Sequence, residues 1–513
     1  MTSLPYTPAR PASRRSRSPW PWITLTLLGL GALGCNQAPK YTRPTLPAPA
    51  PAGYKENQPG SDLAQAHGWK QAAPGDAMLR GKWWEVFGDA QLNALEERLV
   101  IGNQNLKQYF ANYMAARALV RNARASFFPT VSLAPSASAA GYGASGTGVS
   151  GRSYELPLSA TWEPDLFGKV SNAVSADASA AQVSAADLAN ETLSEQASLA
   201  QYYFQLRGQD ALQQLYQRET ASYTEALRLT RVLSRTGIDS DLDVAEAESN
   251  LRTAEANATA IGTTRAQYEH AIALLVGEAA GSFSLPAQPL TATPPAIPTG
   301  LPSQLLERRP DIAAAERTVA QANALIGVAR AAYFPTLSLT ASAGTEASSL
   351  SNLLSYGARF WSLGATATET LLDFGANKAS VQRYQAQYDA DAASYRQTVL
   401  SAFKEVEDDL VASRQLAEQE ARQQLAVQAA LRYQTLAQVR YRTGLDAYLT
   451  VITAENTALT SQQALVTLQT TRMTTAVQLI TALGGGWNAG ELPSQQDVAR
   501  KPQAVRDPGI PKN

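Results

Sequence analysis

The chain has 513 residues, of which 45% are hydrophobic and 17% charged, with a mean hydropathy of −0.21 and a formal net charge of −1. That hydropathy does not fit a protein built mainly of membrane-spanning helices, and the length suffices for a large buried core. The charge balance gives no basic surface of the kind that binds nucleic acid.

The first 34 residues have the pattern of a secretory signal peptide. Four arginines between residues 10 and 17 precede an apolar run at 23–34, which is too short to span a bilayer. The pair Arg14 and Arg15 also fits a twin-arginine signal, although a basic n-region is the simpler interpretation. Because the four arginines are the only charged side chains in the signal, its removal leaves a mature net charge of −5.

Cys35, the only cysteine, follows this run directly. The segment ALGC resembles the bacterial lipobox, in which the cysteine is diacylated and becomes the mature N-terminus, although Ala32 stands where leucine is commoner. A small buried thiol is the alternative. Asn36, in place of the aspartate that favours inner-membrane retention in such lipoproteins, points to the outer membrane. The proline-rich run after it, RPTLPAPAPAG, predicts an extended acylated tether.

The rest of the chain contains an internal repeat. ARASFFPTVSL at 123–133 returns as ARAAYFPTLSL at 329–339, and RTGIDSDLDV at 235–244 returns as RTGLDAYLTV at 442–451. The two offsets, 206 and 207 residues, differ by a single insertion, so we predict two copies of one unit, each with the order helix, β-hairpin, long helix, tip and helix. The predicted segments are a signal peptide (1–34), a tether (35–80), the first copy (81–285), the second copy (286–488) and a polar C-terminal tail (489–513).

Each copy contains two stretches of alternating apolar and polar residues, which predict strands with one apolar face. The apolar set comprises Val131, Leu133, Tyr154, Leu156, Leu158, Ala160, Trp162, Leu337, Leu339, Ala341, Ala343, Trp361, Leu363, Ala365 and Ala367. Strands of about ten residues cross a bilayer when tilted, but four strands cannot close and open edges are not tolerated in lipid. Since transmembrane barrels begin at about eight strands, a membrane location requires strands from several chains. A soluble four-stranded sheet with helices is the alternative.

Long helices follow the strands in both copies. No proline occurs from residue 169 to 233, and the apolar series from Leu193 to Leu215 advances in steps of three and four. More than sixty residues predict a rod of roughly 90 to 100 Å. The alanine-rich stripes fit either an ordinary coiled-coil seam or the wall of a tunnel.

Several strings then carry a family resemblance: LLERRPDI from residue 305, YFPTLSLT from residue 333, WEPDLFGK, YFQLRG and ALGGGW. With them the chain resembles the NodT-type lipoprotein branch of the TolC-like outer-membrane efflux proteins, from Cys35 to Trp487. The resemblance implies a mixed α/β membrane protein. Three chains would form a twelve-stranded outer-membrane β-barrel, four strands from each, continuing into a twelve-helix periplasmic α-barrel.

The resemblance also implies a function and partners. The chain would be the passive outer-membrane exit channel of a tripartite, RND-type efflux system in a Gram-negative bacterium. It would be a homotrimer, lipid-anchored and extending into the periplasm, in contact with outer-membrane lipid, a periplasmic adaptor (membrane fusion) protein and an inner-membrane transporter. The exported substrate is not encoded in this pattern. A structural or adhesive coiled-coil envelope lipoprotein is the main alternative, and a soluble periplasmic binding module is a weaker one.

The two RTG segments are the predicted tips between helices. Glycine accepts the positive φ that a helix reversal often needs, which is a sufficient structural reason for Gly237 and Gly444. In the family the adaptor meets the channel at these tips. The resemblance therefore makes adaptor-contact candidates of Arg235, Thr236, Gly237, Arg442, Thr443 and Gly444.

A periplasmic gate is also expected at the tips. Relatives hold the second-copy tips inward with carboxylates just after the glycine, but Thr450 and Thr453 stand at two of those places here. The candidate gate residues are Asp239, Asp241, Asp243, Tyr441, Arg442 and Asp446. We expect Arg235 and Arg442 to bridge the aspartates and the acidic ring to favour cations. Capping of the helices by these aspartates is the alternative.

Features that would support an enzyme are weak. The chain has two histidines, His67 and His270, and one cysteine, so no zinc-type cluster can be assembled. GYGASG at 141–146 matches the dinucleotide pattern, but it lies between predicted strands with no helix after it. The run Glu405, Glu407, Asp408 and Asp409 predicts a solvated helix face or a tunnel lining. We therefore expect no catalytic residue, metal or cofactor.

Overall fold

The computed structural model describes residues 36–46, 51, 53–55, 81–141, 150–237, 240–297 and 305–500. The predicted signal peptide, Cys35, His67, most of GYGASG, Asp239 and residues 501–513 lie outside the described residues. The chain divides into two units. The sheet unit contains residues 123–174 and 323–384 with the segment up to Lys40, and the helical unit contains 41–122, 175–322 and the residues from 385 onward.

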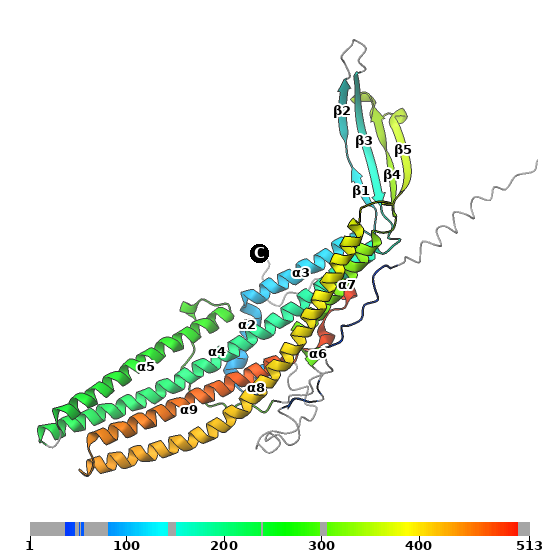
Figure 1. Ribbon diagram of the computed structural model, residues 1–513. Coiled ribbons are helices and arrows are strands. Elements are labelled where there is room, and N and C mark those ends of the chain that lie inside the picture. Colours follow the sequence, from blue (N-terminus) through cyan, green and yellow to red (C-terminus); the bar gives the residue numbers. More distant parts are fainter. Residues whose placement is uncertain are drawn as a thin grey trace, which may run out of the picture. The chain divides into compact units, whose positions relative to one another are not determined.

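The sheet unit has five antiparallel strands in the order β1, β3, β4, β5, with β2 also paired to β3 (Figure 1). The strands are β1 (Thr130–Leu133), β2 (Ser136–Gly141), β3 (Ser150–Trp162), β4 (Thr336–Ala347) and β5 (Arg359–Thr368). Two short 3-10 helices, η7 (Leu350–Asn352) and η8 (Tyr356–Ala358), lie between β4 and β5.

The prediction of four strands was wrong for the first strand position. β1 and β2 pair with β3 in one common register, with Ser132 opposite Ser159 and Ser136 opposite Glu155, so they continue the same line. The break falls at residues 134 and 135, where Pro135 has no N–H to donate to the ladder. The five strands therefore occupy four positions across the sheet.

The register confirms the predicted apolar face. Val131 lies opposite Ala160, Ala160 opposite Ala341, and Ala341 opposite Leu363. Because directly opposed residues point to the same side, the alternating apolar positions form one continuous surface. This surface is most exposed on the outer strands, at 61% for Val131 and 75% for Leu363, and is half-buried at positions such as Leu156 and Leu339 on the middle strands. Serines and threonines such as Ser159 occupy the opposite face.

FFPT and YFPT stand where helix changes to strand. The helix before the first, α3 (Gln104–Ala125), ends four residues before Pro129, and the helix before the second, α7 (Pro310–Ala331), ends four residues before Pro335. Phe334 of the second junction stacks on Phe167, with ring centroids 4.9 Å apart. This contact links the ends of the two copies within the sheet unit.

The helical unit is built on two long hairpins. In each copy a helix of 67 residues is followed by one of 35: α4 (Lys169–Arg235) with α5 (Asp241–Leu275), and α8 (Ala376–Arg442) with α9 (Tyr448–Ala482). They lie side by side in the order α5, α4, α9, α8 (Figure 1). The contacts Arg231–Glu248, Tyr216–Gln463 and Gln438–Glu455 join successive neighbours in this order.

Shorter elements complete the helical unit. They are η4 (Trp83–Phe87), α2 (Ala90–Gly102), η5 (Ala280–Ser282), α6 (Leu305–Arg308), η9 (Ala489–Glu491) and α10 (Gln495–Ala499). The largest hydrophobic cluster packs Trp83 and Leu99 against Phe204 of α4, Leu410 of α8 and Val477 of α9. The predicted stripe from Leu193 to Leu215 is buried, with 8% of Leu193, 4% of Leu215 and none of Phe204 exposed. None of the described helices is both long and apolar enough to cross a membrane.

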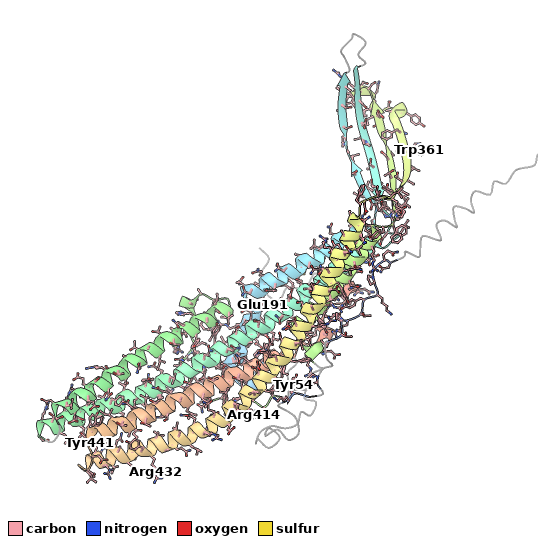
Figure 2. The ribbon with its side chains drawn as sticks, in the orientation of Figure 1. Tyr54, Glu191, Trp361, Arg414, Arg432 and Tyr441 are labelled. Atoms are coloured by element: carbon pink, nitrogen blue, oxygen red, sulfur yellow. The ribbon has the colours of Figure 1, made fainter. Side chains whose placement is uncertain are left out.

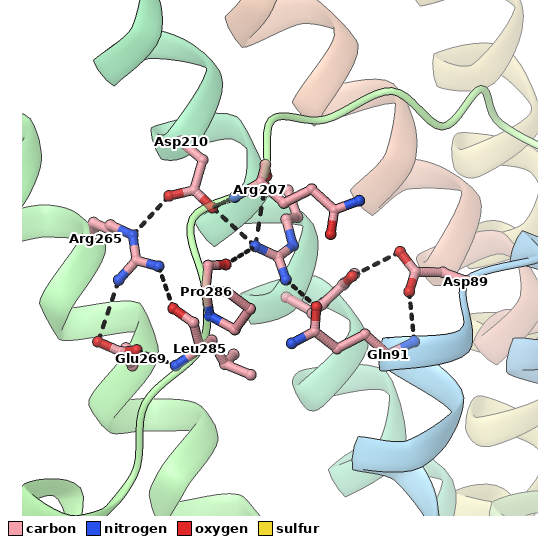
Figure 3. Close-up of polar contacts among 10 residues, drawn as sticks. Asp89, Gln91, Arg207, Asp210, Arg265, Glu269, Leu285 and Pro286 are labelled. Carbon is pink, nitrogen blue, oxygen red and sulfur yellow. Dashed lines mark hydrogen bonds and ion pairs between the residues drawn. The ribbon is translucent and has the colours of Figure 1, made fainter.

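A buried ionic network fixes the segment that follows α5 (Figure 3). Asp210 accepts hydrogen bonds from Arg207 at 2.9 Å and from Arg265 at 2.6 Å. The same two arginines donate to the backbone carbonyls of Pro286, at 2.8 Å, and Leu285, at 2.7 Å. The connection between the two copies is therefore tied to α4 and α5 by charge-assisted hydrogen bonds around the buried Arg207 and Asp210.

Candidate functional site

The first tip joins α4 to α5 and is closed by backbone turns and a helix cap. Gly237 has φ +75°, and its N–H donates to the carbonyl of Ser234 at 2.9 Å. Ser240 and Asp243 form a capping box, with Asp243 N–H donating to Ser240 Oγ at 3.3 Å and Ser240 N–H to Asp243 Oδ2 at 2.9 Å. The side chain of Asp243 is thus occupied at the start of α5.

The second tip joins α8 to α9 and is held differently. Gly444 has φ +74° and donates its N–H to the Tyr441 carbonyl at 2.9 Å, but Ala447 at the N-cap of α9 offers no side-chain acceptor. Asp446 instead turns back to α8, where Arg440 donates to it through Nε at 2.7 Å and Nη2 at 2.9 Å. This bidentate pair lowers the pKa of Asp446.

Arg440 is a residue that the sequence reasoning missed. The sequence predicts that Arg235 and Arg442 bridge the tip aspartates, whereas within this chain Asp446 accepts from Arg440 and Asp241 accepts from Ser234 Oγ at 3.3 Å. The signal was present in the sequence, because a glycine in the left-handed region folds the next residues back over the last turn of the preceding helix.

Arg442 instead lies near the first hairpin. The pKa of Glu225 on α4 is lowered first by the hydrogen bonds from Arg228 and then by the charges of Arg228 and Arg442. Of the other predicted gate residues, Tyr441 packs its ring against Tyr448 with centroids 5.4 Å apart.

The six adaptor-contact candidates are all exposed in the chain. Thr236 and Thr443 use their hydroxyls on their own helices, donating to the carbonyls of Leu233 at 2.8 Å and Arg440 at 2.9 Å. Large apolar side chains stand beside them, with relative exposures of 75% for Leu242, 68% for Leu445 and 60% for Leu449. Both tips therefore present apolar side chains and an arginine, and the first tip also exposes the carboxylate of Asp241.

Behind the tips, two carboxyl groups are buried where the hairpins meet. Glu219 of α4 is 7% exposed and Glu455 of α9 is 1% exposed. Burial, and then the charge of Glu455, raises the pKa of Glu219 to about 7, although a hydrogen bond with Tyr223 opposes the shift. Burial also raises the pKa of Glu455, against a 2.9 Å hydrogen bond from Gln438 of α8. Two such groups repel each other when both are ionised.

The acidic run of α8 is more than a solvated face. Glu405 accepts a hydrogen bond at 2.8 Å from Arg309, which is nearly buried, and Glu407 accepts one at 2.7 Å from the backbone N–H of Lys55. Burial raises the pKa of Asp409 to about 7, aided by Glu405 and Asp408. The run therefore attaches α8 to the start of α7 and to the N-terminal segment. Within the described parts of the chain, no group of three His, Cys, Asp or Glu side chains is arranged to hold a metal ion.

The profile of the family "Outer membrane efflux protein" matches this chain twice, at residues 96–278 and 301–485. The chain belongs to this TolC-like family. The two matches correspond to the two sequence copies, each with a helical hairpin and a part of the sheet. The family consists of efflux channels and is not enzymatic, so this efflux protein is an outer-membrane channel of an efflux pump.

Individual relatives agree over nearly the whole chain. This efflux protein is 34% identical over 493 residues to the probable efflux pump outer membrane protein TtgC of Pseudomonas putida, covering 93% of this chain and 97% of the relative. It is 30% identical to outer membrane protein OprJ of Pseudomonas aeruginosa, with 92% and 98% covered. The solved structure of the outer-membrane channel OprN is 30% identical, with a TM-score of 0.79 over 88% of this chain and 100% of OprN.

Proposed function

We propose that three copies of this chain close one barrel in the outer membrane and continue as a helical tunnel into the periplasm. The supporting observation is a sheet that exposes one continuous apolar face and has free edges at β1 with β2 and at β5 within the described strands. A free edge is not stable in lipid, so neighbouring chains must pair with it. Four strand positions from each of three chains give twelve strands, and α4, α5, α8 and α9 give twelve helices.

A charge placed on either face of β5 tests this assembly. Leu363→Arg puts a guanidinium on the apolar face and is expected to cost about 2–4 kcal/mol per protomer near mid-bilayer. Thr366→Arg introduces the same group on the polar face, toward the lumen, and is expected to leave the trimer intact. The readout is the amount of heat-resistant trimer in outer-membrane fractions and its conductance in a planar bilayer. Equal loss for both variants contradicts the barrel.

The tips of this channel are proposed to meet a periplasmic adaptor, which couples it to an inner-membrane RND-type transporter. The exposed tip glycines, their arginines and the neighbouring leucines offer apolar and charged groups in both copies for such a contact. The same tips are proposed as the gate. The Arg440–Asp446 pair holds the second tip against α8 by an exposed interaction that can be exchanged for another.

Lipidation at Cys35 is proposed as an additional anchor. The closed barrel is already embedded in the bilayer, so the acyl chains contribute attachment during targeting more than final stability. Incorporation of labelled palmitate is expected in the wild type and absent in Cys35→Ser, with trimer present at reduced yield. Labelled Cys35→Ser protein would refute the lipobox assignment.

A further inference from the structure

The end of the sheet away from the helix junctions carries a small hollow. It has a volume of about 400 Å³ and is lined by residues of β3, β4 and β5, among them Arg152, Glu346 and Arg359. Both arginines are exposed. In the proposed channel this end faces the outer leaflet of the outer membrane, because the opposite end of the sheet continues into the helices.

The strand register places both arginines on the apolar face. Arg152 precedes Tyr154 by two residues on β3, and Arg359 precedes Trp361 by two residues on β5, so each shares the side of its aromatic neighbour. Trp361 is 76% exposed. The apolar face thus ends in two guanidinium groups at its outer margin.

The acidic side chains at this end belong to the other face. Glu155 and Glu346 lie directly opposite each other on β3 and β4, in positions that alternate with the apolar set. Both accept hydrogen bonds from Ser153 Oγ, at 3.4 and 3.3 Å. The register therefore directs the basic side chains to the apolar side and the acidic ones to the polar side, and of the two glutamates only Glu346 also lines the hollow at the end of the strands.

The connection between β4 and β5 exposes large apolar side chains of its own. Leu350, Leu354 and Tyr356 have relative exposures of 68%, 80% and 82%. The guanidinium carbon of Arg359 lies 4.7 Å from the centroid of the Tyr356 ring. Stacking on the ring restricts Arg359 while its N–H groups stay available for a ligand.

We propose that this margin binds the phosphorylated headgroup of an outer-leaflet glycolipid, an inference that rests on the proposed barrel. Guanidinium groups recognise phosphate oxygens by paired hydrogen bonds. The occupant is a lipid because two exposed aromatic side chains, Tyr356 and Trp361, lie beside Arg359, and such side chains fit the boundary between headgroup and acyl chains. The two arginines would bind phosphate, while Tyr356 and Trp361 contact the adjacent lipid.

The test is lipid binding to the purified full-length trimer in detergent, measured by native mass spectrometry with diphosphoryl lipid A and with its dephosphorylated form. Wild-type trimer is expected to bind the diphosphoryl lipid more tightly, and Arg152→Gln with Arg359→Gln to lower its affinity by roughly 10- to 30-fold, at about 1 kcal/mol per basic residue. The matched control is Arg383→Gln, since Arg383 is also exposed and stacks on a tyrosine, Tyr384, at 4.4 Å. That control is expected to bind like the wild type.

Two outcomes overturn the proposal: equal binding of both lipids by the wild type, or unchanged affinity in the double variant. Displacement of the lipid by millimolar inorganic phosphate alone would also overturn it, because it would show an anion site without lipid contacts. Failure of the proposed barrel can be distinguished from failure of the lipid site. If the wild type gives no heat-resistant trimer and no conductance, the proposed function fails, whereas a conducting trimer without phosphate preference rejects only the lipid site.

Discussion

The two helical tips come from the same repeated segment, yet different interactions hold them. The first tip is closed by a capping box between Ser240 and Asp243, which belongs to the start of α5 itself. The second lacks a side-chain cap at Ala447 and relies on the pair between Asp446 and Arg440. Figure 2 places Tyr441 at this end of the helical unit, where α8 turns into α9.

The difference shows how a duplicated unit can acquire one fixed and one adjustable end. A capping box satisfies backbone N–H groups, so breaking it disturbs the helix end. An exposed ion pair can exchange its partner for water, salt or another protein at little cost. We therefore infer that the second tip moves when the channel opens and the first tip serves as its fixed neighbour.

The largest effect on export is expected from substitution of the glycine that both tips share. Gly237 and Gly444 both have positive φ, and a Cβ added to either would meet no heavy atom within 4 Å. The cost of Gly444→Val is therefore backbone strain, about 1–3 kcal/mol for a non-glycine residue in this region. We expect loss of export, measured as accumulation of any dye that the wild-type pump removes, with normal trimer assembly.

Gly444→Asn is the matched control, because asparagine tolerates the left-handed region. It is expected to keep most of the export activity. If valine and asparagine abolish export equally, the glycine is required for contact with a partner and its backbone conformation is not the reason.

The second prediction is that removing an aspartate changes the channel conductance at the second tip but not at the first. Asp446→Ala removes the Arg440 pair and is expected to raise single-channel conductance severalfold and weaken cation preference. Asp243→Ala removes one arm of the capping box, so it should lower helix stability slightly and leave conductance unchanged. The measurements are the single-channel conductance and the cation-to-anion permeability ratio of both variants in a planar bilayer. Equal increases in both variants would remove the distinction between a fixed and an adjustable tip.

The sequence predicted the large elements because their signals are local. The absence of proline from 169 to 233 and the three-four spacing indicate α4, and each repeated RTG contains a glycine that the structure places at positive φ. The faces of the sheet follow from alternation alone, and the break at Pro135 could have been predicted from the missing N–H.

Partner choice could not be predicted in the same way. Arg442 lies nearer to Asp446 along the chain than Arg440 does, four residues against six, and only the course of the turn after Gly444 selects Arg440. Glu219 and Glu455 lie 236 residues apart, and each looks like an ordinary polar position on a long helix. Their burial arises because α4 and α9 pack together, which is a property of the tertiary structure.

The smallest effect concerns these two glutamates, which join the hairpin that carries the first tip to the one that carries the second. The pKa of Glu219 is raised to about 7 by burial and by Glu455, compared with 4.5 for an ordinary glutamate. A raised pKa means that the folded state favours the protonated form. Its stabilising contribution is complete below pH 4.5, falls as pH rises through 7, and is absent above that value.

Glu219→Gln keeps the shape of the protonated carboxyl without the ability to ionise. We expect the variant to match the wild type near pH 4.5 and to exceed its free energy of unfolding at pH 8 by about 1–3 kcal/mol per protomer, the cost of an uncompensated buried polar group. The measurement is the thermal midpoint of the trimer between pH 4.5 and 8.

Glu225→Gln on the same helix is the control. Glu225 is exposed and Arg228 lowers its pKa, so this change should give no gain in the free energy of unfolding at pH 8. Parallel pH curves for Glu219→Gln and the wild type would mean that the carboxyl stays ionised at no cost. In that case the stability of the packing between α4 and α9 would not depend on the protonation of Glu219.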